Sequence, residues 1–203
     1  MATVRSEATL PFDAARDAGI KQAETDLKAF VAQVGPAFQN LDGKKFVTVR
    51  SANPQRIPDV HIPIKRLKKL WSKIVFIVTD KTYPPGYGGS FDYKSATSHI
   101  RYDTVNGWNA HPGGLALIVL HELLHSTRQG ADVWKKQWKD YRADCKKRKA
   151  PDDEGKHYTS SPYFSEVEEF CYSGSRELTK ALGLQPYQGP DFEHGYDYGD
   201  IGK

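Results

Sequence analysis

The amino-acid sequence predicts one α+β domain, and three patterns support this fold class. Apolar residues recur at helical spacing in several stretches, residues 74–78 form an apolar and mostly β-branched run, and polar and aromatic residues alternate roughly over 91–105. A chain of 203 residues is long enough to bury one sizeable core. We therefore expect a single domain over 1–203, in which a small mixed or antiparallel sheet packs on helices. Residues 1–12 and 186–203 are expected to be irregular tails.

The first half of the chain is predicted to contain both helices and strands. Asp13 can cap a helix that continues to Val34, because apolar residues recur at helical spacing there and Gly35 supplies a stop. The elements expected next are a short strand at 45–49, a basic helix at 64–72, a buried strand at 74–78, a loop at 81–90 and an edge strand or hairpin at 91–105.

The second half is predicted to be mostly helical. Pro112 stands at a favoured first helical position and opens a helix over 113–129, which Gly130 ends. Apolar residues surround this helix except around residues 121–125, so we expect it to be buried. The elements expected after it are a strongly basic helix at 131–150, a loop at 151–162 and a last helix at 165–182 that Gly183 ends.

Composition and charge exclude few function classes. With 38% hydrophobic and 27% charged residues, the chain has the composition of a globular protein and not of a disordered one. The net charge of +4 is a mild basic bias that does not identify a nucleic-acid-binding protein. No apolar run approaches the roughly 20 residues of a membrane span, and the first 13 residues lack the pattern of a secretory signal. We therefore expect neither a transmembrane helix nor a signal peptide. Cys145 and Cys171 neither require nor exclude an oxidising compartment, and their pairing stays open.

The sequence His121-Glu122-Leu123-Leu124-His125 lies inside the helix that is predicted to be buried. Four residues make slightly more than one helical turn, so both imidazoles project from one face and can bind the same metal ion. Zinc suits such a site, because it accepts neutral imidazole nitrogens and keeps a position open for water when the protein supplies three ligands. Glu122 is rotated by about 100° from His121, where it can act as general base toward that water without binding the metal. Burying these three polar residues without a metal or hydrogen-bond partners would be costly, which argues against a chance pattern.

These five residues resemble the signature of the zincin metallopeptidases, whose motif helix follows an edge strand that aligns the peptide substrate. The resemblance implies a zincin-like fold, a zinc cofactor and hydrolysis of peptide bonds in a peptide or protein substrate. The metzincin group would require glycine at 128 and histidine at 131, where this chain has Arg128 and Ala131. The resemblance is therefore to the glutamate-ligand group, the gluzincins, whose third ligand lies on a later helix. The Asn-Glu pair of thermolysin-like members is absent, because Ser165 precedes Glu166.

The candidates for the third zinc ligand are Glu166, Glu168 and Glu169. The apolar residues of the last helix share one face, with Glu166 and Glu168 about 100° to either side and Glu169 nearly opposite. This periodicity alone disfavours Glu169. In a zincin, however, the ligand-bearing helix crosses over the motif helix and can direct a second face at the metal.

A narrower resemblance is to the metallopeptidase effector domains at the C-terminus of VgrG-type spike proteins of type VI secretion systems. It rests on the motif, on a glutamate 44 residues after His125 and on the lack of a signal peptide. It implies a toxin domain that a secretion apparatus carries into competing bacteria or host cells, with action in the periplasm. The 44-residue offset directs our choice of third ligand to Glu169, with Glu166 second.

A rival interpretation treats the chain as a nucleic-acid or partner-binding module with a structural metal site. Eight basic residues between 135 and 149, interleaved with aromatic residues such as Trp134 and Trp138, can form a basic aromatic face. Asp140 and Asp144 can instead pair with neighbouring basic residues along a solvated helix, so nucleic acid is not the expected partner. A structural zinc is usually closed by four protein ligands, often thiolates. The two cysteines of this chain have no metal-binding spacing, and this also favours an enzyme over a structural metal site.

Two expectations concern residues around the site. Zincins commonly direct a tyrosine or histidine at the developing oxyanion, and His194, Tyr196 and Tyr198 are the candidates for this donor. Cys171 lies on the apolar side of the last helix, where a packed thiol is expected.

Overall fold

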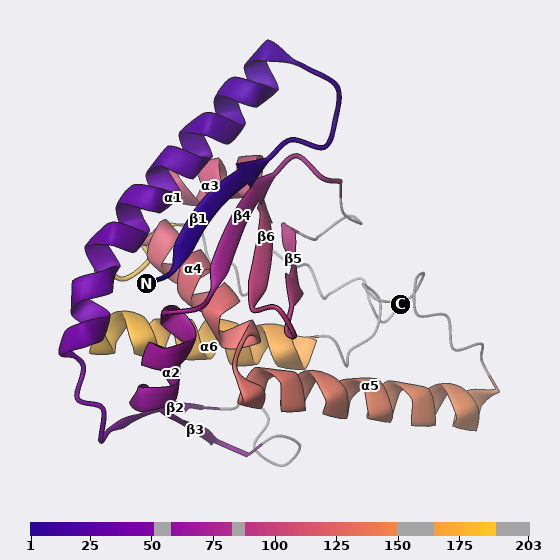
Figure 1. Cartoon of the computed structure of the whole chain (residues 1–203). Helices are drawn as coiled ribbons and strands as arrows, with labels where there is room; N and C mark the ends of the chain where they lie inside the picture. Colours follow the sequence, from indigo (N-terminus) through magenta and orange to yellow (C-terminus); the bar gives the residue numbers. More distant parts are fainter. Residues whose placement is uncertain (51–57, 83–87, 150–164, 190–203) are drawn as a thin grey trace.

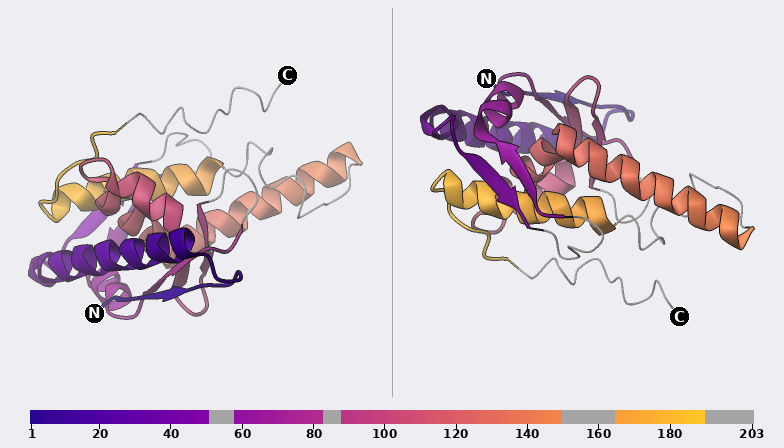
Figure 2. Two further views of the ribbon diagram at one scale, coloured as in Figure 1. Left: turned by 90° about the horizontal axis from the view of Figure 1, so that it is seen from above. Right: turned by 90° about the horizontal axis from the view of Figure 1, so that it is seen from below.

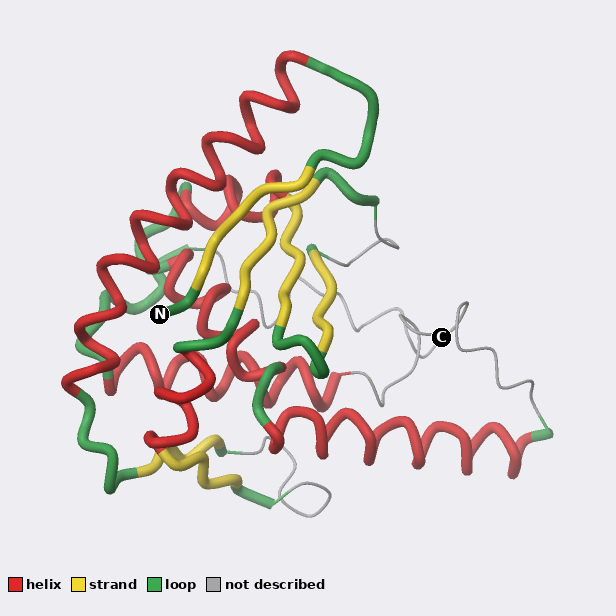
Figure 3. Tube along the Cα trace, in the orientation of Figure 1, coloured by secondary structure: helices red, strands yellow, loops and turns green. Residues whose placement is uncertain are grey.

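The computed structural model describes residues 1–50, 58–82, 88–149 and 165–189. Helices and strands alternate in the first half of the described chain, and helices dominate the second half (Figures 1 and 3). In chain order the elements are β1 (Thr3–Glu7), α1 (Ala14–Asn40), β2 (Phe46–Val49), β3 (Val60–Pro63), α2 (Ile64–Trp71), β4 (Val75–Thr79), β5 (Gly89–Asp92), β6 (Thr97–Arg101), α3 (Tyr102–Asn109), α4 (Gly114–His125), α5 (Arg128–Arg148) and α6 (Ser165–Ala181).

Four strands form the main sheet, in the order β1-β4-β6-β5. β1, β4 and β6 are parallel, with Val75 of β4 opposite both Thr3 and Thr97, whereas β5 runs antiparallel to β6 at the edge. Helices α1, α3 and α4 lie on one side of this sheet (Figures 1 and 2). The prediction of an α+β fold with a small mixed sheet is confirmed.

The N-terminal segment is not an irregular tail, so this part of the prediction is wrong. Residues 3–7 form β1, which pairs along its whole length with β4. Four of its five residues are polar, and only Val4 is buried. A strand whose sequence is mostly polar gives little periodic signal, and the pairing with β4 supplies what the local sequence lacks. Of the predicted C-terminal tail, residues 186–189 have no regular structure, and the rest lies outside the described residues.

Helix α1 begins where the sequence predicts but ends later. The Asp13 side chain accepts a hydrogen bond from the Arg16 backbone N–H at 2.7 Å and caps the helix, as expected. The helix passes through Gly35 and Pro36 to Asn40, so the predicted stop at Gly35 is wrong. Phe38 is fully buried and stacks on Trp71 of α2 with ring centroids 4.5 Å apart, and this packing explains why the last turn stays helical.

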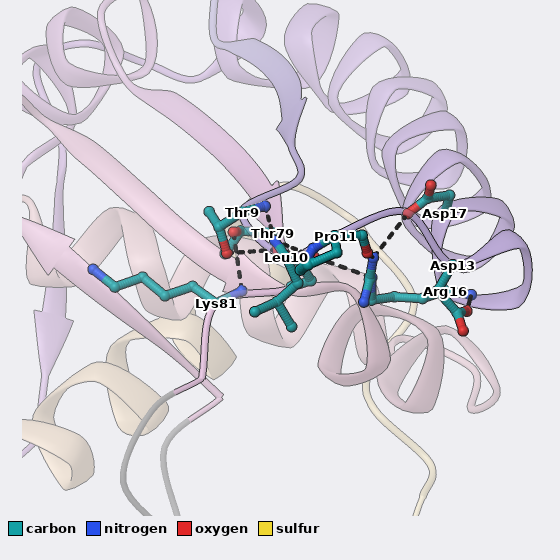
Figure 4. A network of polar contacts seen from close by, with 9 residues as sticks. Thr9, Leu10, Pro11, Asp13, Arg16, Asp17, Thr79 and Lys81 are labelled. Atoms are coloured by element: carbon teal, nitrogen blue, oxygen red, sulfur yellow. Dashed lines mark hydrogen bonds and ion pairs between the residues drawn. The ribbon is translucent and has the colours of Figure 1, made fainter.

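A network of polar contacts links the loop after β1, the start of α1 and the end of β4 (Figure 4). Its main acceptor is the buried Asp80. Asp80 accepts hydrogen bonds from the Thr9 backbone N–H at 2.7 Å, the Thr9 hydroxyl at 2.8 Å and the Leu10 backbone N–H at 3.2 Å. The Arg16 guanidinium lies 3.1 Å from the same carboxylate. Burial by itself raises the pKa of Asp80, but the hydrogen bonds from Thr9 and Leu10 and the Arg16 charge outweigh it and lower the pKa. The network joins β1, α1 and β4 in one corner of the molecule.

The predicted edge strand or hairpin is confirmed as β5 and β6, but it ends earlier than expected. From Tyr102 onward the chain forms helix α3, which the sequence analysis placed in the strand region up to residue 105. Val105 and Trp108 of α3 are buried, three residues apart, and this helical spacing outweighs the short stretch of alternation before it.

The motif helix is shorter than predicted. Helix α4 ends at His125, and a new helix, α5, begins at Arg128 after a short connection (Figure 3). The Thr127 hydroxyl accepts a hydrogen bond from the Gly130 backbone N–H at 2.9 Å and caps α5, so Gly130 lies in the first turn of α5 and does not end the motif helix. Ten of the twelve residues of α4 are buried, as predicted.

Helix α6 packs across α4 and against the small antiparallel sheet of β2 and β3. Gly174 permits the close approach, because a Cβ at this position would lie 2.6 Å from the Leu124 side chain and 2.9 Å from Val49. None of the helices in the described ranges is both long and apolar enough to cross a membrane.

Candidate metal centre

The two motif histidines lie side by side on α4. His121 Nε2 and His125 Nε2 are 3.0 Å apart, and the ring centroids are 4.7 Å apart with the rings nearly perpendicular. His121 is buried, and the His125 side chain is 17% exposed. The four-residue spacing thus brings both Nε2 atoms to one point on the helix surface, as the sequence predicts.

Glu168 of α6 completes the group. Its Oε2 atom lies 3.1 Å from His121 Nε2, and its Oε1 atom lies 3.4 Å from His125 Nε2. One potential ligand atom from each of the three residues lies within 4.8 Å of the others. α6 crosses beside α4 in both views of Figure 2, and this crossing carries the carboxylate to the histidines.

The choice of Glu169 as third ligand is corrected, because Glu169 is exposed and does not belong to this group. The side chain of Glu166, the second choice, lies outside the described residues. One residue along a helix rotates a side chain by about 100°, so Glu168 and Glu169 cannot both face α4. The 44-residue offset from His125 directed the choice to Glu169, although the periodicity of α6 alone disfavours Glu169 and places Glu168 beside the apolar face.

A signal for Glu168 was present in the sequence. Ser175 and Thr179 follow Glu168 by seven and eleven residues, which places all three on one helix face. Both are almost completely buried. The buried surface of α6 therefore extends beyond its apolar residues to a row of small polar ones, and Glu168 stands at the start of that row.

The three side chains fit a divalent metal ion. A tetrahedral ion with bonds of about 2.0–2.1 Å holds its ligand atoms about 3.3 Å apart. The two Nε2 atoms are 3.0 Å apart, and each lies near a different carboxylate oxygen of Glu168, at 3.1 Å for His121 and 3.4 Å for His125. With one ligand atom from each residue, all three atoms lie within 4.8 Å of one another, which is close enough to share one ion. Two imidazoles and a carboxylate suit zinc and several other first-row metals. The group can therefore hold a metal ion, and the described residues supply three ligands to it.

Without a metal ion, the contacts within this group favour an ionised Glu168 beside a protonated His125. Burial opposes the ionised form of Glu168, but His125 and His121 outweigh burial and hold the pKa of Glu168 far below its usual range. Burial likewise opposes the charged form of His125, but contacts with Cys171 and Glu168 raise the pKa of His125 well above its usual value. A metal ion that binds here must displace that proton.

Glu122 lies beside the metal group but is not part of it. Its Oε2 atom accepts a hydrogen bond from the Ser98 hydroxyl of β6 at 2.6 Å, and both side chains are buried. Ser98 is not among the residues predicted for the site. Along β6 the buried residues are Ser98 and Ile100, so strand alternation placed a polar side chain at an inward position, and that was the available signal.

Aromatic rings and a thiol surround the histidines. The Tyr172 ring centroid lies 4.2 Å from that of His121, and the Phe91 ring of edge strand β5 lies 6.4 Å from that of His125. Cys171 is fully buried and lies close to His125. Burial raises the pKa of Cys171 to about 11, so its thiol stays protonated near neutral pH. The expectation of a packed thiol holds, with the addition that it contacts a histidine of the metal group.

The candidate oxyanion donors His194, Tyr196 and Tyr198 lie outside the described residues.

Comparisons of the chain with protein-family models, with curated proteins and with solved structures found no match. The centre is therefore interpreted from its own geometry.

Proposed function

We propose that this chain is a zinc-dependent metallopeptidase with a gluzincin-like centre. The observation that carries the proposal is the convergence of His121, His125 and Glu168, with Glu122 held separately by Ser98. A structural zinc is usually closed by four protein ligands. A three-ligand group next to an uncoordinated carboxylate is instead the arrangement that hydrolysis requires.

Each of these residues has a distinct role in the proposed reaction. His121, His125 and Glu168 hold the ion, which when bound lowers the pKa of a coordinated water and polarises the carbonyl of the scissile bond. Glu122 acts as general base and then delivers the proton to the leaving amine. Because Glu122 Oε2 accepts from the Ser98 hydroxyl, we assign the proton transfer to Oε1. The Ser98 bond also keeps the carboxylate beside the ligands without letting it become one.

The proposed substrate is an extended peptide. β5 is the edge strand of the main sheet, and its Phe91 lies next to His125. A peptide that added to the outer edge of β5 would run past the histidines, with main-chain hydrogen bonds providing affinity that does not depend on its side chains. The amide bonds of cell-wall peptides are an alternative substrate of the same chemical class.

The resemblance to effector domains of type VI secretion extends the proposal to a delivered toxin that acts in the periplasm. This part rests on the motif and on the narrower resemblance alone. Expression of the chain in a bacterial host, directed either to the cytoplasm or to the periplasm, tests it. Growth arrest that requires periplasmic targeting and disappears in Glu122→Gln supports the proposal, and unchanged growth in both compartments contradicts it.

The enzymatic proposal is tested by metal analysis combined with hydrolysis assays. The protein, purified without added zinc, should contain one zinc per chain and should cleave unfolded proteins or peptidoglycan fragments in a chelator-sensitive manner. Glu122→Gln should abolish hydrolysis and keep the zinc, whereas His121→Ala should lose both. If the protein contains zinc but hydrolyses none of these proteins or peptidoglycan fragments, the peptidase proposal is rejected and only a zinc-binding site remains. A chain without metal in which His121→Ala changes nothing would reject the site itself.

A further inference from the structure

Helix α5 carries a concentration of positive charge that the rest of the chain does not share. Together with its C-cap Lys149, it holds nine basic residues against three aspartates, a net charge of +6. The whole chain carries +4, so the remainder is slightly acidic. The first half of α5 packs against α6, and the second half extends away from the sheet and from the other described helices (Figures 1 and 2), so much of this charge lies on a projecting arm.

The three aspartates neutralise only part of α5. Each forms an ion pair four residues along the helix, as the sequence predicts for Asp140 and Asp144. The pairs are Arg128 with Asp132 at 3.7 Å, Lys136 with Asp140 at 2.7 Å, and Arg148 with Asp144 at 2.8 Å. Four other basic residues of α5, Lys135, Lys139, Arg142 and Lys146, are not part of these three pairs.

Lys135, Lys139, Arg142 and Lys146 follow one another at intervals of four, three and four residues. At 100° per residue this spacing puts all four within a sector of about 60° that is roughly 16 Å long. All four side chains are exposed, and within the described part of the chain the three lysines have no ion-pair partner. We call these four residues the basic stripe.

An aromatic edge borders the basic stripe. The Trp134 side chain is 43% exposed, and its ring lies 6.0 Å from that of Trp138 in an edge-to-face arrangement. The Arg142 guanidinium stands over the Trp138 ring at 5.4 Å from its centroid. This contact links the stripe to the aromatic edge and orients one of its cations.

We propose that the basic stripe binds the phosphodiester backbone of a single-stranded nucleic acid, with the exposed Trp134 indole as a stacking surface for one base. A track of cations beside an exposed aromatic ring is the arrangement that binds single strands without sequence preference. The apolar side of α5, formed by Trp138, Tyr141 and Cys145, is buried and is not available for insertion into a lipid surface. The proposal does not depend on the metal centre.

Fluorescence anisotropy with a labelled 20-nucleotide deoxythymidine strand tests the proposal on the full chain. The stripe variant is Lys135→Gln/Lys139→Gln/Lys146→Gln. The control variant is Lys65→Gln/Lys69→Gln/Lys73→Gln, which removes three exposed lysines from α2 and the turn after it and leaves the same net charge. The stripe variant should bind about tenfold or more weakly than the wild type, and its slope of log affinity against log salt should be shallower by about 2, because each phosphate contact contributes about 0.7. The control variant should change affinity by about twofold or less.

Trp134→Ala should weaken binding by about tenfold while leaving the salt slope unchanged, because stacking does not release counterions. Circular dichroism verifies that each variant is folded, and the single variants Lys139→Gln and Lys146→Gln replace the triple one if it is not. Equal losses in the stripe and control variants would overturn the proposal, since net charge alone would then explain binding. No binding by the wild type at 100 mM salt would also overturn it, as would tighter stripe-dependent binding to anionic phospholipid vesicles than to the oligonucleotide.

Discussion

Ser98 on β6 and Glu122 on α4 are joined by a 2.6 Å hydrogen bond between two buried side chains, Ser98 Oγ and Glu122 Oε2. The bond links the central part of the main sheet to the motif helix. It fixes the orientation of the carboxylate that the proposed reaction uses as a base. The Ser98 hydroxyl acts through its bond to Glu122, so we regard Ser98 as a positioning residue.

Replacing Ser98 by alanine should lower kcat of peptide hydrolysis by roughly 10- to 100-fold, because the Glu122 carboxylate would lose its fixed orientation. KM and zinc content should change little. Steady-state kinetics with parallel metal analysis measure both effects. Ser98→Thr retains the hydroxyl and should restore part of kcat. A Ser98→Ala enzyme with wild-type kcat, or one that has lost its zinc, would contradict the positioning role.

Glu168→Ala should weaken zinc binding by at least about 100-fold, because it removes one of three protein ligands. Glu169→Ala is the matched control, since it makes the same substitution at an exposed position one residue along the same helix. Its zinc affinity should stay within about threefold of the wild type. Competition with a chromophoric chelator measures both constants. Severe loss in Glu169→Ala with little change in Glu168→Ala would show that the wrong glutamate is assigned.

The interaction of Glu168 with the histidines should make the stability of zinc-free protein depend on pH. The raised pKa of His125 implies a contribution that is complete below the unfolded histidine pKa of about 6.5 and is lost as pH rises through the folded value. The lowered pKa of Glu168 implies a contribution that is present above about 4.3 and is lost only in strong acid. In chelator, Glu168→Gln should therefore reduce the melting temperature most near pH 5–6 and progressively less toward pH 9. A difference that is constant over this range would contradict the ion pair.

Asp80→Asn should reduce the free energy of unfolding by about 1.5–3 kcal/mol at pH 7, because a buried charged acceptor of three hydrogen bonds is replaced. The lowered pKa of Asp80 means that its contribution is present above about pH 3.9 and is lost as pH falls through the folded value. The effect of the substitution should therefore shrink as pH is lowered from 7 toward 3. Urea unfolding measures it. Asp132→Asn, at an exposed ion pair, serves as control and should change stability by about 0.5 kcal/mol or less. Equal effects of the two substitutions would show that the network around Asp80 does not stabilise the corner.

The parts of the fold that depend on local sequence could be predicted. The β-branched run that became β4, the Asp13 cap of α1 and the position of His121 and His125 on a buried helix are all encoded within a few neighbouring residues. The errors occurred where a distant partner decides the outcome. β1 is a strand because it pairs with β4, and α1 continues past Gly35 because Phe38 stacks on Trp71.

In the candidate site, too, local sequence predicts one part and distant contacts decide the other. The spacing of the two histidines fixes their relation, whereas the third ligand depends on how α6 crosses α4. That crossing is set by Gly174 and by the buried small polar row that begins at Glu168, and helical periodicity of apolar residues alone misses both. Ser98 could not be predicted as a partner of Glu122, because the two residues lie on a strand and a helix whose contact is purely tertiary.

The most direct test of the central claim is an anomalous-difference map from crystals of the protein purified without added zinc, recorded on both sides of the zinc absorption edge. We expect one peak per chain, at about 2.0–2.2 Å from His121 Nε2, His125 Nε2 and a carboxylate oxygen of Glu168. Glu122 should remain bonded to Ser98 and outside bonding distance of the ion. A map without a peak at this position, or a peak bound by Glu122 or Glu169 in place of Glu168, would contradict the account.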